Sequence, residues 1–152
     1  GDGSPDGPQP QQEKELKGAM LEVLYVDDDD DIRHIVELSL GLDPDIKVRI
    51  VSSGAEALVE LDRGGVPDVI LLDVMMPVID GPMLLGLLRQ RADTAEVPVI
   101  FITAYPESLL TGERPEPTFL IAKPFREEMV KAVISQALFF DKVASLRLKD
   151  NV

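Results

Sequence analysis

Five consecutive aspartates, Asp27 to Asp31, directly follow the apolar run 21–26. A buried strand that ends in a cluster of carboxylates concentrates negative charge at one edge of a sheet, where the repulsion is costly unless a cation is bound. Carboxylate oxygens of this kind suit Mg²⁺. We therefore predict a magnesium site at the end of this strand.

The later part of the run has a different explanation. Acidic residues at the start of a helix commonly remain in solvent, where they favour the helix dipole. We interpret Asp29, Asp30 and Asp31 in this way and expect Asp29 or Asp30 to cap the first helix. His34, the single histidine, is expected to lie on the surface with no chemical role.

The elements that must position these residues follow from residue 20 onward. Short runs rich in Val, Ile and Leu alternate with stretches whose apolar residues recur every three or four positions, which predicts a parallel α/β sheet covered on both faces. The predicted strands are 21–26, 46–51, 69–72, 99–103 and 118–122.

Helices are predicted between these strands. The first should bury Ile32, Ile35, Val36 and Leu38 on one face, and the last should run from about residue 126 to near Lys142. The segment 105–117 contains three prolines and a glycine, so the fourth helix should be short or irregular.

Polar residues collect at the predicted strand ends. In an open parallel sheet, ligands bind beyond the carboxyl ends of the strands. The residues found there are Asp27, Asp28, Asp73, Thr103 and Lys123. A carboxylate beside Mg²⁺ and a lysine suits phosphoryl transfer, and we choose Asp73, on the central strand, as the nucleophile that would form an aspartyl phosphate.

Four motifs together resemble the receiver domain of two-component response regulators. They are VLYVDD at 23–28, DVILLDVMMP at 68–77 with the DG pair at 80–81, FITA at 101–104, and KPF at 123–125. The resemblance covers about residues 20–141 and implies a flavodoxin-like doubly wound sheet with strand order 2-1-3-4-5. We divide the chain into a flexible tail or linker (1–19), a receiver domain (20–142) and a C-terminal extension (143–152).

The resemblance also implies roles for individual residues. The magnesium ligands would be Asp27, Asp28, Asp73 and the backbone carbonyl of Met75. The phosphoryl group on Asp73 would contact Thr103, the backbone N–H of Ala104, and Lys123. The Lys123–Pro124 bond would be cis, which aims the lysine at the site.

Met75 and Tyr105 hold positions that govern loss of the phosphoryl group to water in this family. Neither side chain can orient an attacking water as Asn or Glu can. We predict a domain that catalyses its own phosphorylation and then loses the phosphoryl group slowly, without being a conventional enzyme.

The composition of the chain limits the partners and the location that we expect. The net charge of −13 argues against direct binding to nucleic acid, and no apolar run approaches the roughly 20 residues that span a bilayer. The absence of cysteine fits a cytoplasmic location. The resemblance implies a sensor histidine kinase or a histidine phosphotransfer protein as donor and an unidentified output protein; the oligomeric state stays open.

Two alternatives stay open at this point. A Mg²⁺-dependent phosphatase of the haloacid-dehalogenase type would need a second Asp two residues after Asp73, where Met75 stands. A receiver-like binding scaffold that is never phosphorylated would usually lack an acceptor, metal or lysine residue, and all of these are present.

Overall fold

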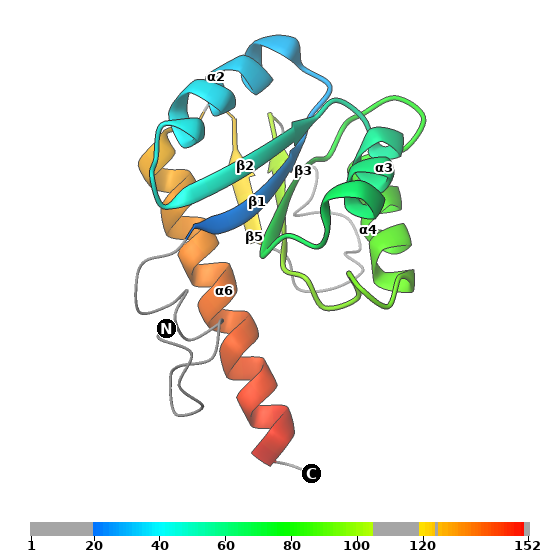
Figure 1. Cartoon of the computed structure of the whole chain (residues 1–152), viewed down its shortest axis with the longest axis vertical. Coiled ribbons are helices and arrows are strands. Elements are labelled where there is room, and N and C mark those ends of the chain that lie inside the picture. The colour runs from blue at the N-terminus through cyan, green and yellow to red at the C-terminus, as the bar shows by residue number, and fades with distance from the viewer. Residues whose placement is uncertain (1–19, 105–118, 124, 151–152) are drawn as a thin grey trace, which may run out of the picture.

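The central element of the protein is a five-stranded parallel sheet (Figure 1). The computed structural model describes residues 20–104, 119–123 and 125–150. The strands are β1 (Leu21–Val26), β2 (Ile46–Val51), β3 (Val69–Asp73), β4 (Val99–Thr103) and β5 (Phe119–Ala122). Their order, β2-β1-β3-β4-β5, confirms the predicted flavodoxin-like topology.

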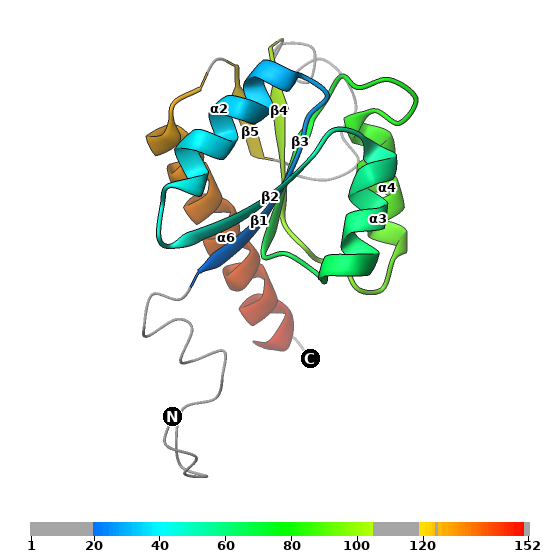
Figure 2. The same ribbon diagram turned by 45° about the horizontal axis from the view of Figure 1, so that its top comes forward.

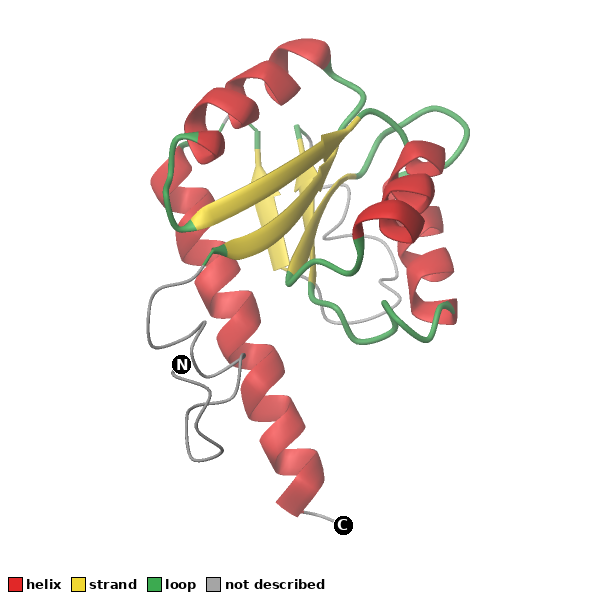
Figure 3. Ribbon diagram, in the orientation of Figure 1, coloured by secondary structure: helices red, strands yellow, loops and turns green. Residues whose placement is uncertain are grey.

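Helices cover both faces of this sheet. They are α2 (Asp30–Gly41), α3 (Gly54–Gly64), α4 (Gly81–Gln90) and α6 (Glu127–Asp150). Helices α2 and α6 lie on one face, and α3 and α4 lie on the other, so the layers are helix, sheet and helix (Figures 1 and 3). The tilted view in Figure 2 shows the same division.

Alternation along the strands explains the two layers of the core. In β1, Val23 and Tyr25 pack toward α2 and α6, whereas Leu24 and Val26 pack toward α3 and α4. Strands β3 and β4 are buried along their whole length. A strand covered on both faces must be apolar throughout, which is why these runs could be found in the sequence.

The predicted buried face of the first helix is partly wrong. Val36 is buried and Ile32 is partly buried, but Ile35 and Leu38 are 50% and 53% exposed. The stripe that covers the sheet follows a spacing of four and continues to Leu40. Ile35 and Leu38 lie beside that stripe.

The last helix is longer than predicted. It begins at Glu127 and continues past Lys142 to Asp150 (Figure 1). Residues 141–150 include no glycine or proline, so the sequence supplies no stop signal near Lys142.

Some predictions fall outside the described residues. These are the flexible tail at 1–19, the short or irregular helix over 105–117, the role of Tyr105, and the cis bond before Pro124. Within the described ranges, no helix combines the length and apolar character needed to cross a bilayer.

Candidate functional site

Three carboxylates meet at the carboxyl edge of the sheet. Oxygen atoms of Asp27, Asp28 and Asp73 all lie within 4.8 Å of one another. Asp27 and Asp73 are buried, whereas Asp28 is exposed. The structure thus brings together the three acidic residues that the sequence predicted as neighbours.

Backbone hydrogen bonds between neighbouring strands fix this edge. The N–H of Asp27 donates to the carbonyl of Val51 at 3.2 Å, so the ladder between β1 and β2 continues one residue past β1. On the other side, the N–H of Lys123 donates to the carbonyl of Thr103 at 2.8 Å. These bonds place Asp27 and Lys123 at defined points on the sheet edge.

Asp27 is a fully buried carboxylate that is well supplied with donors. Its Oδ1 accepts from the backbone N–H of Asp29 at 3.0 Å. Its Oδ2 accepts from the hydroxyl of Tyr25 at 2.8 Å and lies 2.9 Å from Nζ of Lys123. Hydrogen bonds to the charged form are what make a buried carboxylate tolerable.

Lys123 connects two of the carboxylates. Its Nζ lies 2.9 Å from Asp27 and 3.5 Å from Asp73. Burial alone would lower the pKa of Lys123, but the hydrogen bond and charge of Asp27, with the charge of Asp73, outweigh burial and raise that pKa. The side chain therefore remains a cation at neutral pH.

Asp73 has the perturbed carboxyl group expected of a reactive residue. Burial, and then the negative charge of Asp27, raise the pKa of Asp73 to about 7, while Lys123 opposes this rise. The single ammonium of Lys123 therefore does not offset the negative charge of the clustered carboxylates at neutral pH. A second cation would favour the ionised form of Asp73.

The remaining aspartates of the run belong to the start of α2. The carboxylate of Asp29 accepts from the backbone N–H groups of Asp31 and Ile32, at 2.9 and 3.1 Å, so Asp29 is the N-cap, as predicted. Asp30 pairs with Arg33. His34 is exposed, which agrees with its predicted surface position.

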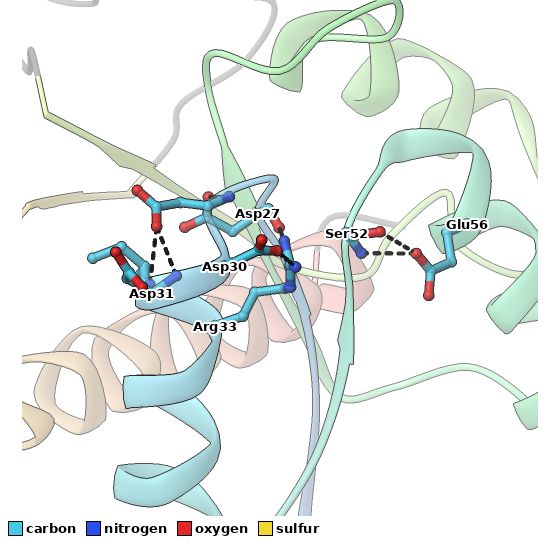
Figure 4. Close-up of polar contacts among 8 residues, drawn as sticks. Asp27, Asp30, Asp31, Arg33, Ser52 and Glu56 are labelled. Atoms are coloured by element: carbon cyan, nitrogen blue, oxygen red, sulfur yellow. Dashed lines mark hydrogen bonds and ion pairs between the residues drawn. The ribbon is translucent and has the colours of Figure 1, made fainter.

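Arg33 links α2 to the loop that follows β1. Its guanidinium donates to the backbone carbonyl of Asp27 at 2.8 Å, and Figure 4 shows this contact beside the pair with Asp30. Across from it, Glu56 accepts from the backbone N–H of Ser52 at 2.9 Å and from the hydroxyl of the same serine (Figure 4). These contacts hold the loops that follow β1 and β2.

Gly81 allows a close approach beneath Asp73. A Cβ at position 81 would lie 2.6 Å from the carbonyl oxygen of Asp73 and 2.9 Å from Cα of Val74. Real Cβ atoms do not come this close to backbone atoms, so only glycine fits at the start of α4 without a backbone shift.

The other predicted site residues have simpler positions. Thr103 is buried and ends β4, in the position after Ile102, the residue that pairs with Asp73. Ala104 follows it and is exposed. The side chain of Met75 is 63% exposed on the loop after β3. Tyr105 lies outside the described residues.

The sequence interpretation missed two residues of the site. Tyr25 was included only as part of an apolar strand, although residues i and i+2 share one face of a strand, and this spacing could have paired it with Asp27. Arg33 contacts Asp27 through a backbone carbonyl. A contact with a backbone carbonyl produces no side-chain pattern from which it could be predicted.

The fold and the carboxylate cluster agree with a comparison against protein families. The model of the response regulator receiver domain matches residues 23–135. The chain therefore belongs to the response regulator receiver domain family.

Among its relatives is the phyllosphere-induced regulator PhyR of Methylorubrum extorquens. It is 43% identical over 143 residues, which are 91% of this chain and 51% of that protein. The anti-anti-sigma factor PhyR from Bartonella quintana has a solved structure that matches with a TM-score of 0.70 and 37% identity, over 90% of this chain and 56% of that chain. This chain thus spans about half the length of these relatives.

A third relative is relevant to the magnesium site that the sequence predicts. It is the receiver domain of the sensor histidine kinase PA1611 from Pseudomonas aeruginosa, whose structure is described with a magnesium ion coordinated in the active-site cleft. It matches with a TM-score of 0.61 and 26% identity, over 79% of this chain and 98% of that chain.

Proposed function

We propose that this receiver domain accepts a phosphoryl group on Asp73 and changes its contacts with a protein partner in response. One observation carries the proposal. Asp73 is a buried carboxylate that lies within 4.8 Å of two further carboxylates and 3.5 Å from the ammonium of Lys123. Such an arrangement combines a nucleophile with the means to neutralise phosphoryl oxygens.

The donor set fits Mg²⁺. Three carboxylates offer hard oxygen ligands, and Asp28 is exposed, so part of the coordination sphere can remain water, as Mg²⁺ prefers. Asp27, Asp28 and Asp73 would hold the ion, and the backbone carbonyl of Met75 is proposed as a further ligand. Bound Mg²⁺ would neutralise charge on the phosphoryl oxygens.

The residues of the chain then have distinct tasks. A carboxylate oxygen of Asp73 attacks phosphorus in line, so that an O–P bond forms while the P–N bond of phosphohistidine breaks. The histidine leaves as neutral imidazole when its other nitrogen carries a proton. Lys123 neutralises the transferred oxygens, and Thr103 and the N–H of Ala104 donate to them.

The partners are inferred from the same chemistry. The donor is a phosphohistidine on a sensor histidine kinase or a phosphotransfer protein. The net charge of −13 favours output through protein contact over contact with a phosphate backbone. Because relatives include an anti-anti-sigma factor, the output partner we propose is a protein that controls a sigma factor.

Incubation with acetyl phosphate and Mg²⁺ tests the proposal. We expect a stable label on Asp73, no label without Mg²⁺, and no label in the Asp73→Asn variant. The Asp93→Asn variant is the matched control, since Asp93 is far from the site and pairs with Arg91. Continuous release of phosphate would favour a phosphatase instead, and absence of any label would favour a binding scaffold.

A further inference from the structure

Tyr25 brings a neutral donor into the carboxylate cluster from within the core. Its ring is fully buried on the α2 and α6 side of the sheet, together with Leu71 and Ile102. Its hydroxyl donates to Oδ2 of Asp27 at 2.8 Å. A buried tyrosine hydroxyl needs an acceptor, and here the acceptor is one of the three clustered carboxylates.

The hydrogen bonds on Asp27 distinguish its two oxygens. A carboxylate has about four lone-pair directions, two on each oxygen. Oδ2 is contacted by two donors, Tyr25 and Lys123, whereas Oδ1 accepts one bond, from the N–H of Asp29. Oδ2 therefore has both directions filled, and Oδ1 retains one for a cation.

The two donors on Oδ2 differ in what else they must do. Lys123 also lies 3.5 Å from Asp73 and is the group that would follow a phosphoryl oxygen there. Tyr25 is fixed in the core, and within the described part of the chain its hydroxyl donates to Asp27 alone. When Lys123 turns toward a phosphoryl group, Tyr25 is the donor that remains on Oδ2.

We infer that Tyr25 is a positioning residue of the site: its hydroxyl holds Asp27 in the orientation that binds the metal, in both the resting and the phosphorylated states. This inference rests on the proposed function. Partners that orient metal ligands in this way typically change metal affinity about 10- to 100-fold when they are removed.

The Tyr25→Phe variant removes only the hydroxyl. We expect its dissociation constant for Mg²⁺ to rise about tenfold, measured by titrating ¹⁵N-labelled protein with MgCl₂ and following amide resonances of the site loops. In acetyl phosphate reactions the Mg²⁺ concentration for half-maximal rate should rise by the same factor. The rate at saturating Mg²⁺ should change less than about twofold, because Tyr25 does not touch the phosphoryl group.

Thr94→Val is the matched control. Thr94 is fully buried, and its hydroxyl donates to the carbonyl of Leu88 at 2.6 Å in the loop before β4, away from the carboxylates. Both variants lose one buried hydroxyl and should lose some stability in EDTA. Only Tyr25→Phe should lose affinity for Mg²⁺. Equal Mg²⁺ affinity in Tyr25→Phe and wild type would overturn the inference and leave the hydroxyl with a purely structural role.

A measurement on the unmutated protein covers the case in which the variant does not fold. The chain has two tyrosines, Tyr25 and Tyr105, so ¹³Cζ-labelled tyrosine gives two resonances. The Tyr25 resonance should shift during the Mg²⁺ titration with the same dissociation constant as the amides, and no shift would overturn the inference. If wild type neither binds Mg²⁺ nor accepts a phosphoryl group, the proposed function fails first and this inference fails with it.

Discussion

The ammonium of Lys123 lies 2.9 Å from a carboxylate oxygen of Asp27, a residue with no exposed surface. In the absence of a metal ion this pair is the main compensation for the charge of Asp27, and Lys123 also reaches Asp73 at 3.5 Å. The cation that the reaction would use is thus also part of what makes the resting site stable.

Replacing Lys123 by Met should therefore destabilise the metal-free protein. Removing one member of a buried ion pair leaves the other charge uncompensated, and because this site reaches solvent we expect the free energy of unfolding to fall by roughly 2 kcal/mol in EDTA. Saturating Mg²⁺ should restore much of the loss, since it supplies positive charge at the same place. Urea denaturation with and without Mg²⁺ measures both effects.

Lys131→Met is the control for this experiment. Lys131 pairs with the buried Asp43 at the far end of the sheet. Its loss should not respond to Mg²⁺. An equal loss for Lys123→Met in EDTA and in Mg²⁺ would contradict the argument.

The raised pKa of Asp73 predicts a specific dependence of stability on pH. Burial and Asp27 raise this pKa from 3.8 to about 7, so the folded state holds the proton more tightly than the unfolded state between these values. The free energy of unfolding of the metal-free protein should therefore fall as pH rises through this window. Asp73→Asn removes that fall and should be more stable than wild type at pH 8 by on the order of 2 kcal/mol.

Urea denaturation in EDTA at pH 5 and pH 8 measures the difference between Asp73→Asn and wild type, which should be larger at pH 8. Asp43→Asn is a control of opposite sign, because the hydrogen bond from Lys131 lowers the pKa of Asp43. That variant should be less stable than wild type by the same amount at pH 5 and at pH 8, because both values lie above the lowered pKa of Asp43. A pH-independent effect of Asp73→Asn would count against a raised pKa for Asp73.

The glycine beneath Asp73 gives a steric prediction. In Gly81→Ala the new Cβ would lie 2.6 Å from the carbonyl oxygen of Asp73, so the backbone must move. We expect a loss of about 1–3 kcal/mol in stability and a fall of at least about tenfold in the rate of phosphorylation by acetyl phosphate, because small displacements of reacting groups are costly. Labelling rates and urea denaturation measure the two effects.

Gly86→Ala is the matched control on the same helix. Gly86 is exposed, and a Cβ there meets no atom within 4 Å. This variant should be more stable than wild type by about 0.5–1 kcal/mol, since alanine favours the helix. Its phosphorylation rate should be unchanged. Similar phosphorylation rates for Gly81→Ala and Gly86→Ala would show that the close approach does not affect the position of Asp73.

The sequence could predict the sheet and the carboxylate cluster because both depend on local rules. Strands buried on both faces are apolar along their whole length, and the carboxyl ends of parallel strands lie at one edge. The positions of Asp27, Asp28 and Asp73 follow directly, and the structure confirms that they meet.

The features that could not be predicted depend on how a helix is rotated about its axis and on how side chains are directed in three dimensions. Which apolar residues of α2 face the sheet is set by packing, so Ile35 was placed in the core although half of its surface is exposed. The hydrogen bond from Tyr25 to Asp27 depends on the direction of a ring that the sequence shows only as apolar. The end of α6 could not be predicted because no glycine or proline near Lys142 marks an end of the helix.

Met75 gives the final prediction, which concerns the lifetime of the phosphorylated state. Its side chain is 63% exposed two residues after Asp73, and a thioether cannot orient an attacking water as an amide or carboxylate can. We expect a half-life of many minutes for the aspartyl phosphate in Mg²⁺ buffer. Met75→Asn should shorten it several-fold, whereas Val78→Asn, which is 93% exposed on the same loop, should leave it unchanged. Decay of the wild-type label within seconds, or an equal effect of the two asparagines, would show that the residue at position 75 does not limit access of water to the phosphoryl group.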